Sequence, residues 1–78
     1  MFVYDRAAAL GLVGWVANEP DGSVRTVAQG PEPLLLAFLR DLRTGPRAAR
    51  VEAVDERWLP PADDLDRFSI RSGWHAGD

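Results

Sequence analysis

The sequence predicts an α+β domain in which two helices cover one face of a mostly antiparallel sheet. Three observations support this prediction. Two segments space their apolar residues as amphipathic helices do, two segments joined by a proline–aspartate–glycine turn have the pattern of a β-hairpin, and β-rich stretches follow the second helical segment. Helices and strands in this order pack as two layers around one core.

The length and the composition indicate one small globular domain. The chain has 78 residues, of which 46% are hydrophobic and 27% are charged, so it has the composition of a folded protein and not of a disordered segment. A net charge of −3 argues against a nucleic-acid partner or a membrane surface. We expect a single domain over residues 1–72, followed by a flexible tail over residues 73–78.

The residue counts restrict the possible chemistry. Cysteine is absent, which excludes disulfides, thiol nucleophiles and thiolate metal sites, and His75 is the only histidine, which argues against a histidine-pair metal centre or a catalytic triad. The longest apolar run, Leu34–Leu39, is too short to span a bilayer, and the first residues lack signal-peptide features. We therefore expect a cytoplasmic protein with no metal and no other cofactor.

The first half of the chain predicts a helix followed by a hairpin. Three apolar residues share one helix face: Val3, Ala7 and Leu10. Gly11 follows where the C′ residue of that helix is expected. Leu12–Asn18 and Val24–Ala28 are β-rich, and the Pro20-Asp21-Gly22 segment between them is typical of a tight turn.

The second half predicts a longer helix and two further strands. The apolar stripe of the helix consists of Leu35, Phe38, Leu39 and Leu42. Thr44-Gly45-Pro46 ends this helix. Arg50–Trp58 is predicted to be a third strand with a bulge, Pro60–Asp66 an acidic loop and Phe68–Arg71 a short last strand.

This order of elements matches a ferredoxin-like βαββαβ unit without its first strand. In that topology the first strand lies inside the sheet, so its absence would leave two rows of unpaired backbone groups. We therefore expect that the chain is incomplete at its start, or that strand exchange or dimerisation fills the gap.

The most specific motif lies in the predicted hairpin. Gly14-Trp15-Val16-Ala17-Asn18 is followed at fixed intervals by Gly22, Ser23, Val24 and Gly30. This pattern resembles the second signature of the acylphosphatase family, in which glycine, an aromatic residue, a small apolar residue, any residue and asparagine precede glycine, valine and glycine at these spacings. Other stretches extend the resemblance from Val3 to Arg71: Gly11-Leu12, Gly45–Val51 and Phe68–Arg71.

The resemblance implies an enzyme that hydrolyses the carboxyl–phosphate bond of small acyl phosphates by water attack, without a metal or a covalent intermediate. Inorganic phosphate would be its product or inhibitor. In the family, an asparagine at the end of the second strand orients the water, and an arginine in a loop before the first helix binds the phosphate. Asn18 matches the asparagine and is the only one in the chain. The family loop would end immediately before Met1, so we expect only the water-positioning half of the site here.

Alternatives remain open at this point. Asparagine before a Pro-Asp-Gly turn is also common turn chemistry, although the signature around Asn18 favours the catalytic role. Arg6 and Arg71 are the candidates to replace the family arginine, but neither stands in a helix-opening loop. A catalytically inactive interaction module is the second functional hypothesis. A fragment of a hydrogenase-maturation carbamoyltransferase is the third, and the absence of cysteine-rich zinc segments argues against it.

Overall fold

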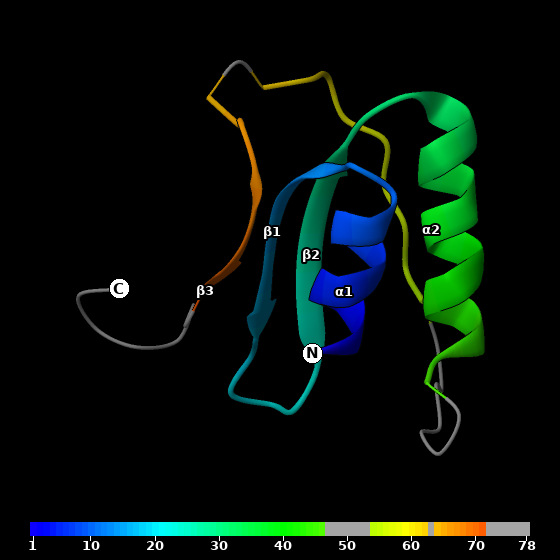
Figure 1. Ribbon diagram of the computed structural model, residues 1–78. Helices are drawn as coiled ribbons and strands as arrows, with labels where there is room; N and C mark the ends of the chain where they lie inside the picture. The colour runs from blue at the N-terminus through cyan, green and yellow to red at the C-terminus, as the bar shows by residue number, and fades with distance from the viewer. Residues whose placement is uncertain (47–53, 63, 72–78) are drawn as a thin grey trace.

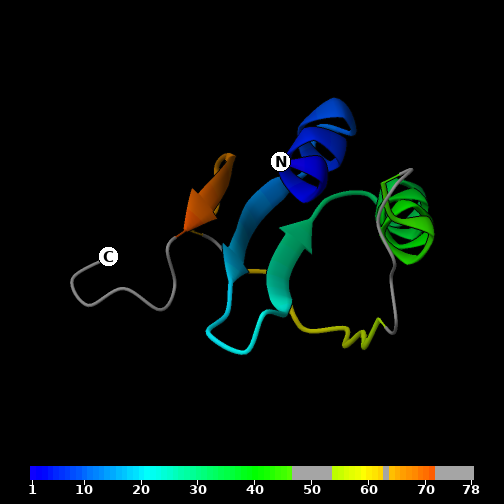
Figure 2. The ribbon, with the colours of Figure 1, turned by 90° about the horizontal axis from the view of Figure 1, so that it is seen from below.

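Two helices lie on one face of a three-stranded sheet in the computed structural model, which describes residues 1–46, 54–62 and 64–71 (Figure 1, Figure 2). The elements follow in the order α1 (Phe2–Ala9), β1 (Val13–Asn18), β2 (Val24–Gln29), α2 (Glu32–Thr44) and β3 (Phe68–Arg71). The α+β prediction is therefore confirmed, and each of these five elements lies within a residue or two of its expected place. The tail predicted over 73–78 falls outside the described residues.

β1 is the central strand of the sheet. It pairs antiparallel with β2, which places Asn18 opposite Val24, and parallel with β3, which places Gly14 opposite Phe68. Among the described strands the sheet is thus mixed, where the sequence predicted a mostly antiparallel one. A parallel pair needs a long connection, and here α2 and the irregular segment Val54–Ala62 lie between β2 and β3.

A tight turn reverses the chain between α1 and β1. The Leu12 N–H donates to the Ala7 carbonyl (3.0 Å) and the Gly11 N–H donates to the Ala8 carbonyl (3.1 Å), the pair of bonds that defines a Schellman motif. Gly11 has the φ of +69° expected of its C′ position. The turn places α1 antiparallel to β1 and packs Ala7 and Leu12 together in the core.

The core is small and lies between the sheet and both helices. Its buried members are Ala7, Leu12, Val16, Phe38 and Phe68. The ring of Phe68 has its centroid 6.2 Å from that of Tyr4 in α1 and 6.3 Å from that of Phe38 in α2. One aromatic side chain of the last strand therefore holds both helices to the sheet.

The strand predicted over Arg50–Trp58 is not found where the structure describes it. Residues 50–53 lie outside the described residues, and Val54–Trp58 has no regular secondary structure. A strand exists only through hydrogen bonds to a neighbour. Among the described strands none pairs with this segment, so its β-rich pattern alone does not make it a strand.

Gly14 allows β2 to approach β1 closely. An ideal Cβ at this position would overlap the Val27 carbonyl oxygen and lie 2.8 Å from the carbonyl carbon, and its φ is +142°. The first glycine of the signature is therefore required by the backbone of the adjacent strand. Gly22 differs, because it has a φ of +90° but no atom within 4 Å of its ideal Cβ.

We expect Gly14→Ala to destabilise the fold far more than Gly22→Ala. Both substitutions strain a positive φ, which costs about 1–2 kcal/mol, but only the first also forces the β1–β2 ladder apart. Chemical denaturation of the two variants, followed by circular dichroism, measures the difference. Equal losses of unfolding free energy would contradict the close-approach explanation.

The hairpin turn is held by Asp21. Its Oδ1 accepts hydrogen bonds from the Ser23 hydroxyl (2.6 Å) and the Ser23 N–H (2.9 Å), while the Gly22 N–H donates to the Glu19 carbonyl (3.0 Å). This is a three-residue loop with glycine at the bulge position. The bonds from the Ser23 hydroxyl and then the Ser23 N–H lower the pKa of Asp21 below its ordinary value of 3.8.

The lowered pKa of Asp21 predicts an acid-sensitive hairpin. The charged carboxylate is favoured in the folded state, so its contribution is complete above the ordinary pKa and is lost as the pH falls through the folded-state pKa. The wild-type chain should have a higher Tm than Asp21→Asn near neutral pH, and this advantage should shrink below about pH 4. A pH-independent difference in Tm would contradict the role of the charge.

Candidate active site at the end of the central strand

Asn18 is the last residue of β1, and its side chain lies on the face that carries the helices. The β1–β2 register is continuous from Val13 to Asn18, so side chains alternate along this strand without interruption. Val16 is fully buried beneath the helices, and Asn18 shares its face one step further along. Asn18 itself is exposed. The core therefore sets the direction in which the Asn18 carboxamide leaves the strand.

The start of α1 lies at the same end of the molecule as Asn18. Because α1 and β1 are joined by the Schellman turn and run in opposite directions, the helix begins where the strand ends (Figure 1). Met1 occupies the N-cap position and makes no side-chain cap hydrogen bond. The first N–H groups of a helix carry partial positive charge and favour an anion. The carboxamide and the helix N-terminus thus lie at the same end of the fold.

The turn after Asn18 fixes the strand end. Asn18 pairs with Val24, and the next pair, Glu19 with Ser23, closes the hairpin through the Glu19 N–H and the Ser23 carbonyl (2.8 Å). The turn bonds themselves are made by Asp21 and Ser23. Among the described residues, no hydrogen bond of the turn uses the Asn18 side chain, so its carboxamide keeps its donors and acceptors for other partners.

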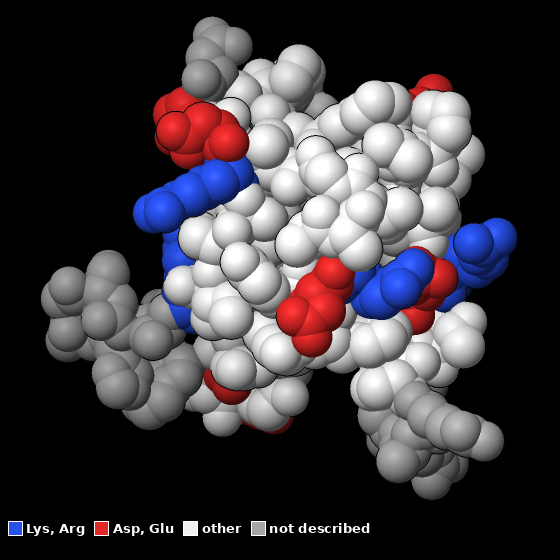
Figure 3. Space-filling model, viewed as in Figure 1, with Lys and Arg blue, Asp and Glu red and all other residues white. Residues whose placement is uncertain are grey.

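Arg6, one of the two candidate substitutes for the family arginine, holds the two helices together. Its Nε and Nη2 atoms donate to Oδ2 of Asp41 in α2 at 3.0 and 2.8 Å. The Asp41 side chain is only 20% exposed, so this ion pair is partly shielded from water. Figure 3 shows basic and acidic side chains in contact on the face that carries the helices. Arg6 is therefore a packing residue.

Arg71, the other arginine, lies on the opposite face of the sheet from Asn18. Its guanidinium carbon is 4.7 Å from the centre of the Trp15 ring, a cation–π arrangement. Trp15 and Asn18 point to opposite faces because they are an odd number of residues apart. The structure therefore places neither of the two arginines beside Asn18.

The sequence did not reveal these two arginine contacts. Arg6 and Asp41 are 35 residues apart, and Arg71 reaches Trp15 only through the parallel β1–β3 ladder. No local pattern connects such pairs. Trp15 itself is half-buried, as is usual for an aromatic residue on a strand.

In the described part of the chain, acidic and histidine side chains do not form a cluster of the kind that binds a metal ion. No group of three such residues there could hold a metal ion. Neither described helix combines the length and the apolar character that crossing a bilayer requires.

Comparison with known proteins identifies the chain. The family model described as acylphosphatase matches residues 1–70. The acylphosphatase of Salinibacter ruber is 46% identical over 70 residues, which cover 90% of this chain and 74% of the relative. That of Anaeromyxobacter dehalogenans is 43% identical over 67 residues, which cover 86% of this chain and 72% of the relative.

Solved structures agree with the sequence comparison. The crystal structure of acylphosphatase from Bacillus subtilis matches with a TM-score of 0.76 at 34% identity, covering 90% of this chain and 78% of that one. The structure of T. kodakarensis HypF matches with a TM-score of 0.77 at 31% identity, covering 90% of this chain but 9% of that much longer protein. The ferredoxin-like fold is therefore confirmed.

Three findings indicate the same family. They are the signature on β1, the arrangement of the helices and the sheet, and the match over nearly the whole chain. They favour a hydrolase over an inactive interaction module. The chain belongs to the acylphosphatase family, enzymes that hydrolyse acyl phosphates.

Proposed function

We propose that Asn18 orients the water that attacks the phosphorus atom of a small acyl phosphate. The observation that supports this role is its position: the carboxamide lies on the helix-covered face of β1, at the end of the molecule where α1 begins. A carboxamide can accept one proton of a water molecule and still donate a hydrogen bond elsewhere. It can therefore hold a water in line with the bond that breaks.

The chemistry makes modest demands on the protein. The leaving group is a carboxylate, which departs readily, so positioning of the water and stabilisation of charge on the phosphoryl oxygens supply most of the catalysis. We place the phosphate at the start of α1, where free N–H groups and the helix dipole favour an anion. The arginine that the family uses belongs to the loop before this helix, and its motif is not present in residues 1–78.

Two further features belong to this proposal. We place the enzyme in the cytoplasm, and the finding that neither described helix could span a bilayer is consistent with that location. We also propose that a strand from another polypeptide, by strand exchange or dimerisation, pairs with the free edge of β2. The position of that edge beside an open cavity supports the second point.

We expect Asn18→Ala to lower the rate of phosphate release from acetyl phosphate by a factor on the order of 10²–10³, the usual cost of removing one positioned hydrogen-bonding group. The measurement needs a preparation that releases phosphate at a measurable rate and that circular dichroism shows to be folded. Glu19→Ala, a change at the next residue, serves as the matched control and should keep the rate. Full activity in a folded Asn18→Ala protein would contradict the proposed role.

A further inference from the structure

The sheet face opposite the helices, here called the outer face, carries charge of one sign. The register places Trp15 and Ala17 on it, because Val16, between them, points to the helices. The three described strands contain two arginines, Arg25 and Arg71, and no acidic residue. The whole chain, in contrast, has 12 acidic residues against 9 basic ones. The outer face is therefore a cationic surface on an acidic protein.

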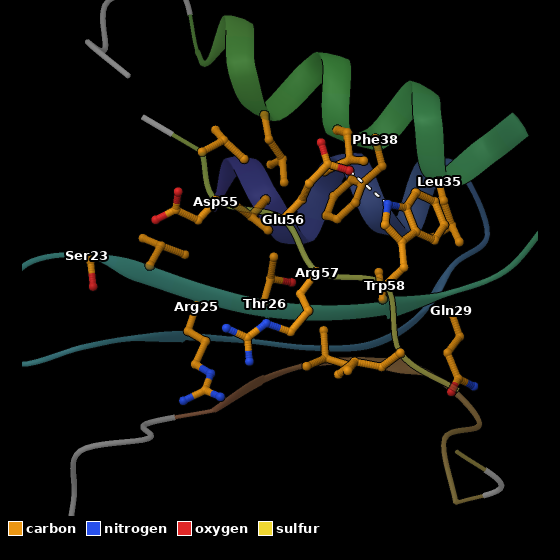
Figure 4. Close-up of a pocket in the computed structure, with 18 of the residues that line it drawn as sticks. Ser23, Arg25, Thr26, Gln29, Leu35, Phe38, Asp55, Glu56, Arg57 and Trp58 are labelled. Atoms are coloured by element: carbon orange, nitrogen blue, oxygen red, sulfur yellow. Dashed lines mark hydrogen bonds between the residues drawn. The ribbon is translucent and has the colours of Figure 1, made fainter. Parts of the chain in front are cut away.

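Arg25 and Arg71 stand in one row across the sheet. Arg25 in β2 and Arg71 in β3 are both register partners of Ala17 in β1, the strand between them. Paired residues of neighbouring strands share a face, and the strands lie about 4.8 Å apart, so the Cα atoms of the two arginines are separated by about 10 Å. Figure 4 shows Arg25 pointing away from α2. One partner segment can therefore reach both guanidinium groups.

Neither arginine of this row has a carboxylate partner in the described part of the chain. The arginines that form ion pairs there are Arg6 and Arg43. The guanidinium carbon of Arg71 lies 4.7 Å from the centre of the Trp15 ring, and this cation–π contact holds the side chain in place without neutralising its charge. Both arginines of the row are exposed. Their positive charge is therefore accessible to an anionic group from outside.

An apolar area adjoins the row of arginines on the outer face. Trp15 and its register partner Val27 form the next row, and Val13 follows two residues before Trp15 on the same face of β1. All three side chains are half-buried, so each still offers surface to a partner. Tryptophan and arginine are the residues that most often anchor protein interfaces. The outer face thus combines an apolar area with a cationic end.

We infer that the outer face docks an acidic segment of a partner protein. Carboxylates of the segment pair with Arg25 and Arg71, and an apolar side chain beside them packs on Trp15 and Val27. A net charge of −3 and a single tryptophan on the described strands disfavour a nucleic acid. A second copy, placed face to face, would set arginine against arginine. The inference is independent of the proposed catalysis, because Asn18 lies on the other face.

Titration of the isotope-labelled 78-residue chain with an acidic peptide, followed by NMR, tests this inference. The probe is the hexapeptide Glu-Glu-Leu-Leu-Glu-Glu with blocked ends. The indole N–H signal of Trp15 and the amide signals of Ala17 and Val27 should shift as peptide is added. The amide signal of Leu36, an exposed residue of α2, should not move. An unchanged Trp15 indole signal at millimolar peptide would overturn the inference.

The two arginines are tested with matched variants. Arg25→Gln should weaken binding of the acidic peptide by a factor of about two to five, the usual contribution of an exposed ion pair, and Arg25→Gln/Arg71→Gln by roughly tenfold. Arg25→Gln keeps the contact between Arg71 and Trp15, so this test does not depend on the fold tolerating the loss of Arg71. Arg40→Gln removes one charge from α2, across the sheet, and should bind as the wild-type chain does. Unweakened binding by folded Arg25→Gln would overturn the inference.

Matched probes identify the class of partner. The peptide Lys-Lys-Leu-Leu-Lys-Lys should leave the Trp15 indole signal in place, and about 0.5 M NaCl should weaken binding of the acidic peptide several-fold, because salt screens exposed charges. A thymidylate tetranucleotide has a similar negative charge and should bind more weakly than the acidic peptide. Tighter binding of the tetranucleotide would make the partner a nucleic acid and would overturn the inference, as would equal binding of the two peptides.

Discussion

The close approach of β2 to Gly14 is the constraint on which the rest of the fold depends. The Val27 carbonyl occupies the space where any side chain at this position would stand. This contact permits the uninterrupted ladder between β1 and β2, and the ladder sets which side chains of β1 face the helices. A slip by one residue would turn Val16 out of the core and Asn18 to the opposite face. Core packing and the position of Asn18 therefore depend on the same register.

β1 serves a different purpose on each of its faces. On the helix side, Val16 joins the core and Asn18 lies at the exposed end, where α1 begins. On the other side, Trp15 packs beneath Arg71. Both candidate phosphate ligands thus have other contacts, Arg6 between the helices and Arg71 on the far face. The N-terminus of α1, at the same end of the fold as Asn18, suits an anion.

Local sequence patterns were sufficient to predict the elements that form their hydrogen bonds within one segment or with the next segment along the chain. The helix endings at Gly11 and Gly45, the Pro20-Asp21-Gly22 turn and the apolar stripe of α2 all follow from short-range rules, and the structure agrees with each. The signature around Asn18 also identified the family, because its residues lie on one hairpin and keep their spacing in the sequence.

The sequence by itself determined the helices, the hairpin, the last strand and the residue proposed to orient water. Only the tertiary structure decided that Val54–Trp58 is not a strand, that β3 runs parallel to β1, and that Arg6 and Arg71 bind Asp41 and Trp15. The physical reason is common to all of these. A helix or a tight turn satisfies its hydrogen bonds among residues close in sequence, whereas a strand or an ion pair needs a partner that only the folded chain supplies.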